Sequence, residues 1–313
     1  AVPYILSGEW YENDEPFEDY MRRMYRESPL FRTLQERGYR MEFYDEELYL
    51  DDEIAQMFSN VYRVDFELSS YVRFAKPLLK LVGFRYAPFE QKKCIFKMAA
   101  IDELVKVENA QEKYSFSQQD HIFKSQLDQR GISEQDTQAK FQFIHLNGAH
   151  VPFIYDENMN IIDEEEGTYE QTMLAVLSGA GNYVEKLRGS GAYDNTVLII
   201  MADHGYNGSL DESGEEAWMR QCPLLLIKGM GETHDTMQIS QAPISFEDLQ
   251  EAYTRLLDGK QSTAAFDWKE GDVRERRFLK YSFLDEDHMQ EYVQTGYAFD
   301  RNTMKATGRE YNR

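Results

Sequence analysis

Short apolar runs alternate with amphipathic stretches along most of the chain, which indicates strands separated by helices. Residues 197–202 form a continuous apolar run rich in β-branched side chains, as expected for a strand that is buried on both faces. Residues 141–146 and 223–228 are similar in length and character. Between the runs at residues 141–146 and 197–202, Thr168 can form a capping box with Gln171 and begin a long amphipathic helix. This order of elements is typical of an α/β fold.

The rest of the chain has weaker patterns of the same kinds. Further elements are expected as a helix over residues 29–38, a strand over 39–44, one or two helices over 51–81, a helix after Ser245, and peripheral strands over 277–283 and 292–299. No repeat, low-complexity tract or convincing linker separates these elements. We therefore expect one domain over residues 1–313, with residues 45–140 as a mainly helical insertion on its core.

An acid and an imidazole follow the apolar run at residues 197–202. Asp203 and His204 come directly after it, and Gly205 allows the backbone to turn sharply. Ligands of open α/β sheets collect beyond the carboxyl ends of the strands. A carboxylate oxygen and an imidazole nitrogen are both ligands that zinc accepts. The pair is therefore a candidate metal site, and the alternative is a loop acid beside a hydrogen-bonded histidine.

Two further histidines flank the end of the run at residues 141–146. His145 lies inside the run, where it is either a core residue or a functional one, and His150 lies in the loop that follows. A loop histidine has little packing to do, so His150 is the stronger candidate. Asn147, and Asn207 after the other strand, either donate hydrogen bonds to a substrate or only form turns. We expect these residues to gather at one edge of the sheet.

Three motifs together resemble a known family. Phe-Ile-His-Leu-Asn-Gly-Ala-His-Val-Pro-Phe at residues 143–153, Tyr-Asp-Asn-Thr at 193–196 and Ala-Asp-His-Gly at 202–205 are similar to the sulfatase-like branch of the alkaline phosphatase superfamily. The likeness is greatest to bacterial envelope enzymes, namely phosphoethanolamine transferases, lipoteichoic acid synthases and phosphoglycerol transferases. The resemblance implies a three-layer α/β/α sandwich with a mostly parallel central sheet, incomplete at the N-terminus.

The resemblance also covers the first residues. Ala1 to Gly8 looks like the end of the family's nucleophile segment, where a threonine, serine or formylglycine opens a helix after an acidic metal ligand. Both groups would then precede Ala1, so the given chain is expected to be inactive by itself. Formylglycine sulfatases have an arginine where this chain has Val2, which favours a threonine or serine nucleophile. Phosphoethanolamine transferases carry a further histidine in the region of Glu215 and Glu216, so the transferred head group stays open.

The activity implied by the resemblance is a metal-dependent transfer of a phosphoryl group to cell-envelope glycans or lipids through a covalent phospho-enzyme. Asp203 and His204 would bind the metal, zinc or manganese rather than the calcium expected of a sulfatase. The residues assigned to catalysis are His150 and His145, and those assigned to substrate binding are Asn147 and Asn207. Two alternatives stay open: a sulfatase or phosphodiesterase-type hydrolase, and a non-catalytic member that binds a glycan or a partner.

Composition narrows the choice of partners. The formal net charge of −22 argues against nucleic acid, whose phosphates would be repelled. Residues 71–98 differ, with seven Lys and Arg residues and a single acid, Glu90, among apolar side chains. Such a segment can rest on an anionic membrane surface, or it can pair with the acidic remainder or pack on the core. Cys94 and Cys222 border apolar runs and are expected to be buried thiols.

The expected location follows from the resemblance alone. No apolar run approaches the ~18 residues that a membrane span needs. Since the family's membrane helices precede the catalytic domain, the resemblance implies a membrane-anchored protein at the extracytoplasmic face of a bacterial cell. Its partners would be a phospholipid-type donor and an envelope glycan or lipid acceptor.

Overall fold

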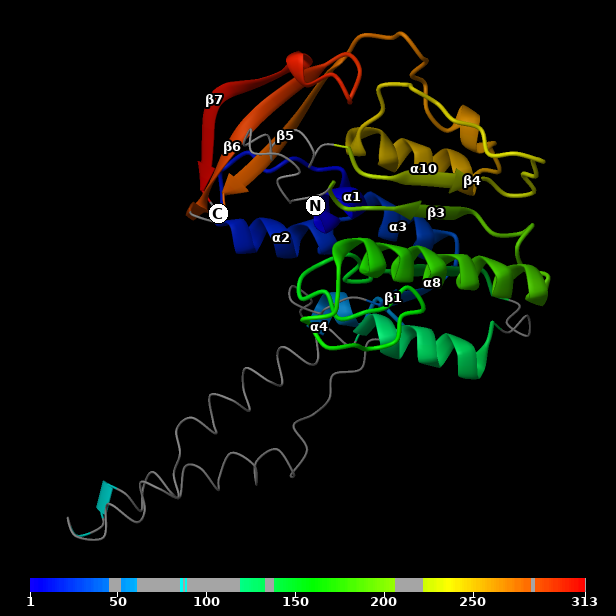
Figure 1. The fold of residues 1–313 in the computed structure, drawn as a ribbon. Helices are drawn as coiled ribbons and strands as arrows, with labels where there is room; N and C mark the ends of the chain where they lie inside the picture. The colour runs from blue at the N-terminus through cyan, green and yellow to red at the C-terminus, as the bar shows by residue number, and fades with distance from the viewer. Residues whose placement is uncertain are drawn as a thin grey trace.

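The computed structural model describes residues 1–44, 52–60, 85–86, 88, 119–132, 138–205, 222–282 and 285–312, and within these ranges it is an α/β structure (Figure 1). In chain order the helices are α1 (Val2–Ser7), α2 (Phe17–Arg26), α3 (Pro29–Glu36), α4 (Asp52–Ala55), a helix over 119–130, α8 (Tyr169–Ser190) and α10 (Leu249–Leu257). The strands are β1 (Arg40–Tyr44), β2 (Lys140–Ile144), β3 (Leu198–Met201), β4 (Leu225–Lys228), β5 (Glu275–Ser282), β6 (Asp285–Thr295) and β7 (Met304–Asn312). Short 3₁₀ turns are η1 (Phe246–Asp248), η2 (Ser262–Ala264) and η3 (Arg301–Thr303).

The described strands form three small sheets. β1 and β2 are parallel, with Arg40 opposite Lys140 and Tyr44 opposite Ile144. β3 and β4 are antiparallel, and β5, β6 and β7 form an antiparallel sheet in that order. The candidate residues follow β2 and β3. Of these two strands, β2 belongs to a parallel pair and β3 to an antiparallel pair. Each of the four β3 residues is half-buried rather than fully buried, and β4 is its hydrogen-bonded neighbour within the described ranges.

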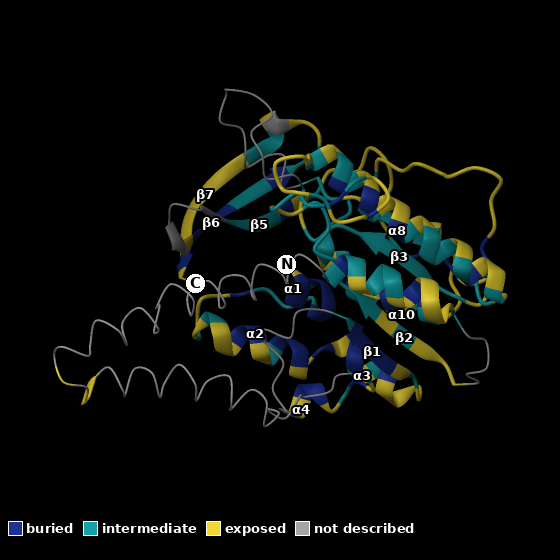
Figure 2. Ribbon diagram, turned by 60° about the horizontal axis from the view of Figure 1, so that its bottom comes forward, coloured by how far each residue is buried: buried dark blue, intermediate teal, exposed yellow. Residues whose placement is uncertain are grey.

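One hydrophobic cluster joins β1, β2 and β3 to a group of helices. Its strand residues alternate along the chain, as a pleated strand requires for one face: Met41 and Phe43 of β1, Phe141 and Phe143 of β2, Ile199 and Met201 of β3. Its helical residues come from α1, α2, α3, α4 and α10, and include the fully buried Phe31 and Leu34. Figure 2 shows α1 and β1 largely in the colour of buried residues. The carboxyl ends of β2 and β3 are therefore attached to the same core.

The opposite face of β1 and β2 carries polar side chains. Glu42 of β1 is 5% exposed and accepts a hydrogen bond from Gln142 Nε2 at 2.7 Å. Gln142 Oε1 in turn accepts one from the hydroxyl of Tyr183 on α8 at 2.8 Å. Phe123, in the helix over 119–130, packs edge to face on Tyr44 with ring centroids 6.1 Å apart. Helices therefore contact both faces of the β1–β2 pair.

The three-stranded sheet packs on α2 near one end of the protein (Figure 1). Met289 of β6 and Tyr311 of β7 share a cluster with Tyr20 and Met24 of α2. The backbone N–H of Asn312 donates to the Asn13 side chain at 3.0 Å, so β7 is also tied to the segment before α2.

Most elements expected from the sequence are present, with shifted ends. The pattern at residues 29–38 is α3, the pattern at 39–44 is β1, and the capping box of Thr168 begins α8 as predicted. The strand expected over 292–299 was placed wrongly, because β6 ends at Thr295 and the chain turns at Gly296 with a φ of 82°. β7, α1 and α2 were not predicted. Nearly all the residues of β7 are exposed, so they lack the alternation that marks a half-buried strand.

Several sequence predictions fall where the structure gives no description. Most of the insertion over 45–140 and of the basic stretch over 71–98 lies outside the described residues, as do Asn207 and Cys94. Cys222 is half-buried and has a free thiol. Within the described ranges, no helix is both long enough and apolar enough to cross a bilayer.

Candidate functional site

The exit of β2 is built on a buried carboxylate. The ladder extends one residue past the strand, because the N–H of His145 donates to the carbonyl of Tyr44 at 2.8 Å. Beyond it the N–H groups of Asn147 and Gly148 donate to Asp120 Oδ1 and Oδ2 at 2.8 and 3.1 Å. Asp120 belongs to the helix over 119–130 and its exposure is 0%. The first turn after β2 is therefore held from outside the loop itself.

Burial dominates the electrostatics of Asp120. Removal from water raises the pKa of its carboxyl, and the N–H groups of Asn147 and Gly148 and the nearby His145 oppose that rise without cancelling it. Burial, and after it the charge of the same carboxyl, raise the pKa of the Tyr155 hydroxyl to about 12. A buried acid thus holds two residues, Asn147 and Gly148, that lie between the two candidate histidines in the sequence.

His150 lies exposed in the loop after this turn. Its Nδ1 is 2.6 Å from the carbonyl oxygen of Val151. A carbonyl only accepts, so Nδ1 must carry the hydrogen, and in a neutral ring the lone pair then lies on Nε2. His145 has different surroundings: it is half-buried, with its ring centroid 6.2 Å from that of Phe143. The structure therefore places His150 at the surface and His145 on the side of the strand that faces the core.

The exit of β3 places Asp203 and His204 side by side. The Nδ1 of His204 is 2.6 Å from the carbonyl oxygen of Gly205, which assigns the hydrogen to Nδ1 by the same reasoning. Its Nε2 is 3.8 Å from Asp203 Oδ1, and the two side chains are 44% and 36% exposed. Metal-binding histidines usually donate their other ring N–H to a carbonyl or a carboxylate, and both loop histidines have this arrangement.

The spacing of Asp203 and His204 fits two ligands of one metal ion. Two bonds of about 2.1 Å join ligand atoms that are up to about 4.2 Å apart, so 3.8 Å is within reach of one ion. Across the ranges that the structure covers, however, no three His, Cys, Asp or Glu side chains are grouped closely enough to hold an ion. Asp203 and His204 therefore fit a metal ion as part of its ligand set. That His150 lies close to them stays a prediction.

The loop from His150 to α8 packs closely on itself. Tyr155 and Ile161 form an isolated antiparallel bridge, and the carbonyl of Met159 contacts His121 Nδ1 at 3.1 Å. Gly167 lies against the backbone of Phe153, where an added Cβ would be 1.7 Å from the carbonyl oxygen. The loop that carries His150 is thus clamped between the helix over 119–130 and the start of α8.

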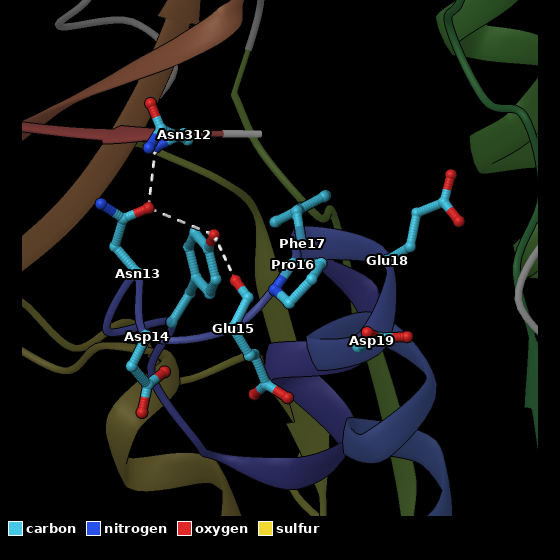
Figure 3. Close-up of a pocket in the computed structure, with 9 residues that line it drawn as sticks. Asn13, Asp14, Glu15, Pro16, Phe17, Glu18, Asp19 and Asn312 are labelled. Atoms are coloured by element: carbon cyan, nitrogen blue, oxygen red, sulfur yellow. Dashed lines mark hydrogen bonds between the residues drawn. The ribbon is translucent and has the colours of Figure 1, made fainter.

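A cavity of about 750 Å³ lies elsewhere, against the beginning of α2 (Figure 3). It is lined by Tyr11, residues 13–19 and Asn312, four of which are acidic. Figure 3 shows the Asn13 side chain pointing toward Asn312, whose backbone N–H donates to it at 3.0 Å. The Tyr11 hydroxyl also donates to Asn13, at 3.3 Å. None of the residues predicted for the candidate site lines this cavity.

Sequence reasoning missed Asp120. It lies 27 residues before the turn that it holds, in a segment without a recognisable motif. No local signal distinguishes it from the many surface acids of this chain, so only the folded structure reveals its partners.

No protein-family model matches the chain, and no curated protein is similar to it in sequence. Among solved structures, Ps i-CgsB in complex with k-i-k-neocarrahexaose is 13% identical, with a TM-score of 0.47 over 97% of this chain and 74% of that one. The phosphonate monoester hydrolase SpPMH from Silicibacter pomeroyi is also 13% identical, with a TM-score of 0.40 over 97% of this chain and 78% of that one. Similarities of this size do not decide a fold family or an activity, so the arguments below depend on residues of this chain.

Proposed function

We propose that this chain is the catalytic part of a metal-dependent phosphoryl-group transferase that acts on cell-envelope glycans or lipids. The observation that carries the proposal is the pair of loop histidines. His150 and His204 each follow a strand and each donate Nδ1–H to the next carbonyl, so Nε2 bears the lone pair in both. Imidazoles with this tautomer are suited to bind a metal or to accept a proton.

The proposed roles follow the chemistry of each group. Asp203 and His204 would hold a divalent ion, zinc or manganese, through one carboxylate oxygen and one imidazole nitrogen. Such an ion, when bound, supplies a Lewis acid that offsets the charge of a phosphoryl group. His150, and with it His145, would contact the phosphoryl oxygens or the leaving group.

The remaining parts of the proposal come from the family resemblance. A threonine or serine hydroxyl, expected upstream of Ala1, would attack phosphorus and break the bond to the donor's alcohol oxygen, which leaves with a proton. An acceptor hydroxyl would then attack the phosphorus of the covalent phospho-enzyme, and the enzyme hydroxyl would leave and regain its proton. The resemblance also supports a three-layer α/β/α arrangement, a phospholipid-type donor, and a place at the outer face of a bacterial membrane.

The test compares substrates and variants of the full-length protein. We expect turnover of a phosphodiester lipid donor, inhibition by a chelator, and no turnover of a sulfate ester. Asp203→Asn and His204→Ala should each lower kcat/KM about 100-fold or more, and should lower the metal content measured by mass spectrometry. His234→Ala is the matched control, since His234 is also 44% exposed and hydrogen-bonded, to Glu232. It follows β4, whose carboxyl end lies beside the start of β3 and therefore at the other end of the pair from His204.

The alternatives give different results in the same assays. Turnover of the sulfate ester alone would identify a sulfatase and refute the phosphoryl chemistry. Release of the head group to water with no acceptor product would identify a phosphodiesterase. If neither substrate is turned over, with or without bound metal, the protein would be a non-catalytic member that binds a glycan or a partner.

A further inference from the structure

Among the acids that the structure describes, Asp120 is unusual because it is completely buried and both its oxygens accept backbone N–H groups. These donors belong to consecutive residues, Asn147 and Gly148, at 2.8 and 3.1 Å. The two N–H groups come just after β2, where the ladder with β1 ends. A carboxyl group has an acceptor oxygen for each of two such donors, whereas an asparagine side chain has a single acceptor oxygen.

The helix that carries Asp120 is itself anchored to α8. Asp128, two turns further along the same helix, accepts a hydrogen bond from Asn182 Nδ2 at 3.0 Å and lies 3.4 Å from Lys186 Nζ. His121 contacts the carbonyl of Met159 at 3.1 Å, in the loop that follows His150. The carboxylate of Asp120 is therefore presented to the turn by a supported element rather than by a free loop.

We infer that Asp120 is a positioning residue that fixes the turn between His145 and His150 and so sets where the His150 imidazole lies. The inference rests on the proposed function for its effect on catalysis, and on the two hydrogen bonds for its effect on the loop. Asp120 lies behind the backbone of the turn, so it acts on a substrate only through the loop. Its removal should therefore loosen the loop and slow the chemical step, with little effect on substrate affinity.

The test measures amide hydrogen exchange and kinetics on the full-length protein, comparing Asp120→Asn with Glu232→Gln. The second variant changes another buried carboxylate that accepts two backbone N–H groups, at a position after β4 and outside the turn. In Asp120→Asn one donor loses its acceptor and faces an amide NH₂. We expect the amides of Asn147 and Gly148 to exchange about tenfold faster or more in Asp120→Asn, and to be unchanged in Glu232→Gln.

The kinetic readout separates positioning from mere support of the fold. We expect kcat for the phosphodiester donor to fall about 10- to 100-fold in Asp120→Asn with KM little changed. Equal exchange at residues 147 and 148 in the two variants would overturn the inference, as would faster exchange with an unchanged kcat. If Asp120→Asn does not fold, hydrogen exchange of the wild type is the test. Amides at residues 147 and 148 that exchange without protection in the wild type would also overturn the inference. A wild type without turnover would refute the proposed function, while exchange would still show whether Asp120 holds the turn.

Discussion

Gly167→Ala is a direct test of how the loop after His150 is clamped. A Cβ added to Gly167 would be 1.7 Å from the carbonyl oxygen of Phe153, 2.6 Å from its carbonyl carbon and 3.3 Å from its Cβ. The first two of these atoms belong to the backbone, so no side-chain rotation relieves the overlap. Ordinary contacts between such atoms need about 3.5 Å, so the two backbone segments would have to separate by roughly 1.5 to 2 Å.

That separation has a cost on each side of the contact. On one side, Gly167 immediately precedes Thr168, whose backbone N–H donates to Gln171 Oε1 at 3.1 Å and whose hydroxyl oxygen accepts from Gln171 N–H at 3.2 Å. On the other, the Phe153 ring packs edge to face on Tyr169 with centroids 6.0 Å apart. Loss of a helix cap costs about 1 kcal/mol and local overpacking about 1–3 kcal/mol. We therefore expect the free energy of unfolding to fall by about 2–4 kcal/mol in Gly167→Ala.

The assay is urea denaturation of Gly167→Ala, compared with alanine variants of two glycines within α8, Gly179 and Gly181. An added Cβ at Gly181 meets nothing within 4 Å, so Gly181→Ala should gain about 0.5–1 kcal/mol from helix propensity. A Cβ at Gly179 would be 2.9 Å from the terminal methyl of Met159, which can swing away, so Gly179→Ala should lie between the two. The expected order of stability is Gly181→Ala, Gly179→Ala, Gly167→Ala.

The reasoning would be refuted by a Gly167→Ala protein with the denaturation midpoint and slope of the wild type. Such a result would mean that the loop does not approach α8 as closely as the structure shows. A loss of stability equal in all three variants would also contradict it, because the effect would then not depend on the space around each glycine.

Two further predictions concern buried ion pairs and pH. Arg274, whose side chain is 9% exposed, donates to both oxygens of Asp248 at 2.7 and 2.8 Å. Because its removal leaves a buried charge without its partner, Arg274→Ala should lower the free energy of unfolding, measured by urea titration, by about 3 kcal/mol. A loss below about 1 kcal/mol would show that water solvates the ion pair. Burial raises the pKa of Glu232, but hydrogen bonds from Ser262, the N–H of Gly229 and His234 hold the pKa at about 2, below the ordinary 4.5. A carboxyl whose pKa is lowered by folding contributes stability that is complete above pH 4.5 and is lost as pH falls toward 2. In Glu232→Gln the melting temperature should therefore depend less on pH between 4.5 and 2 than in the wild type. The same pH dependence in both proteins would contradict the lowered pKa of Glu232.

The elements around the candidate site were predictable because their signals are local. The apolar runs at β2 and β3 and the capping box at Thr168 each lie within a few consecutive residues. The histidines and the Asp203–His204 pair could be placed at strand exits for the same reason. Their hydrogen-bonding partners could not be predicted, since the carbonyl acceptors of His150 and His204 depend on loop conformation.

Features that depend on distant partners were missed. Asp120 is one of many acids in the sequence, and its burial arises only when its helix meets the turn after β2. β7 carries mostly exposed side chains and is a strand because of its ladder with β6, which periodicity does not encode. The antiparallel pairing of β3 and β4 likewise could not be predicted, because the apolar runs alone contain no information about strand direction.

The contacts between β7 and the segment before α2 have a consequence for how the protein is made. Asn312 bonds to Asn13 across 299 residues, and Gln250 Nε2 bonds to the carbonyl of Ile5 across 245. During synthesis the apolar faces of α1 and α2 must therefore wait for strands and helices that leave the ribosome much later. Native contacts between such distant residues form slowly and leave apolar surface open to aggregation meanwhile. A nascent chain of this design should depend on chaperones until β7 has left the ribosome.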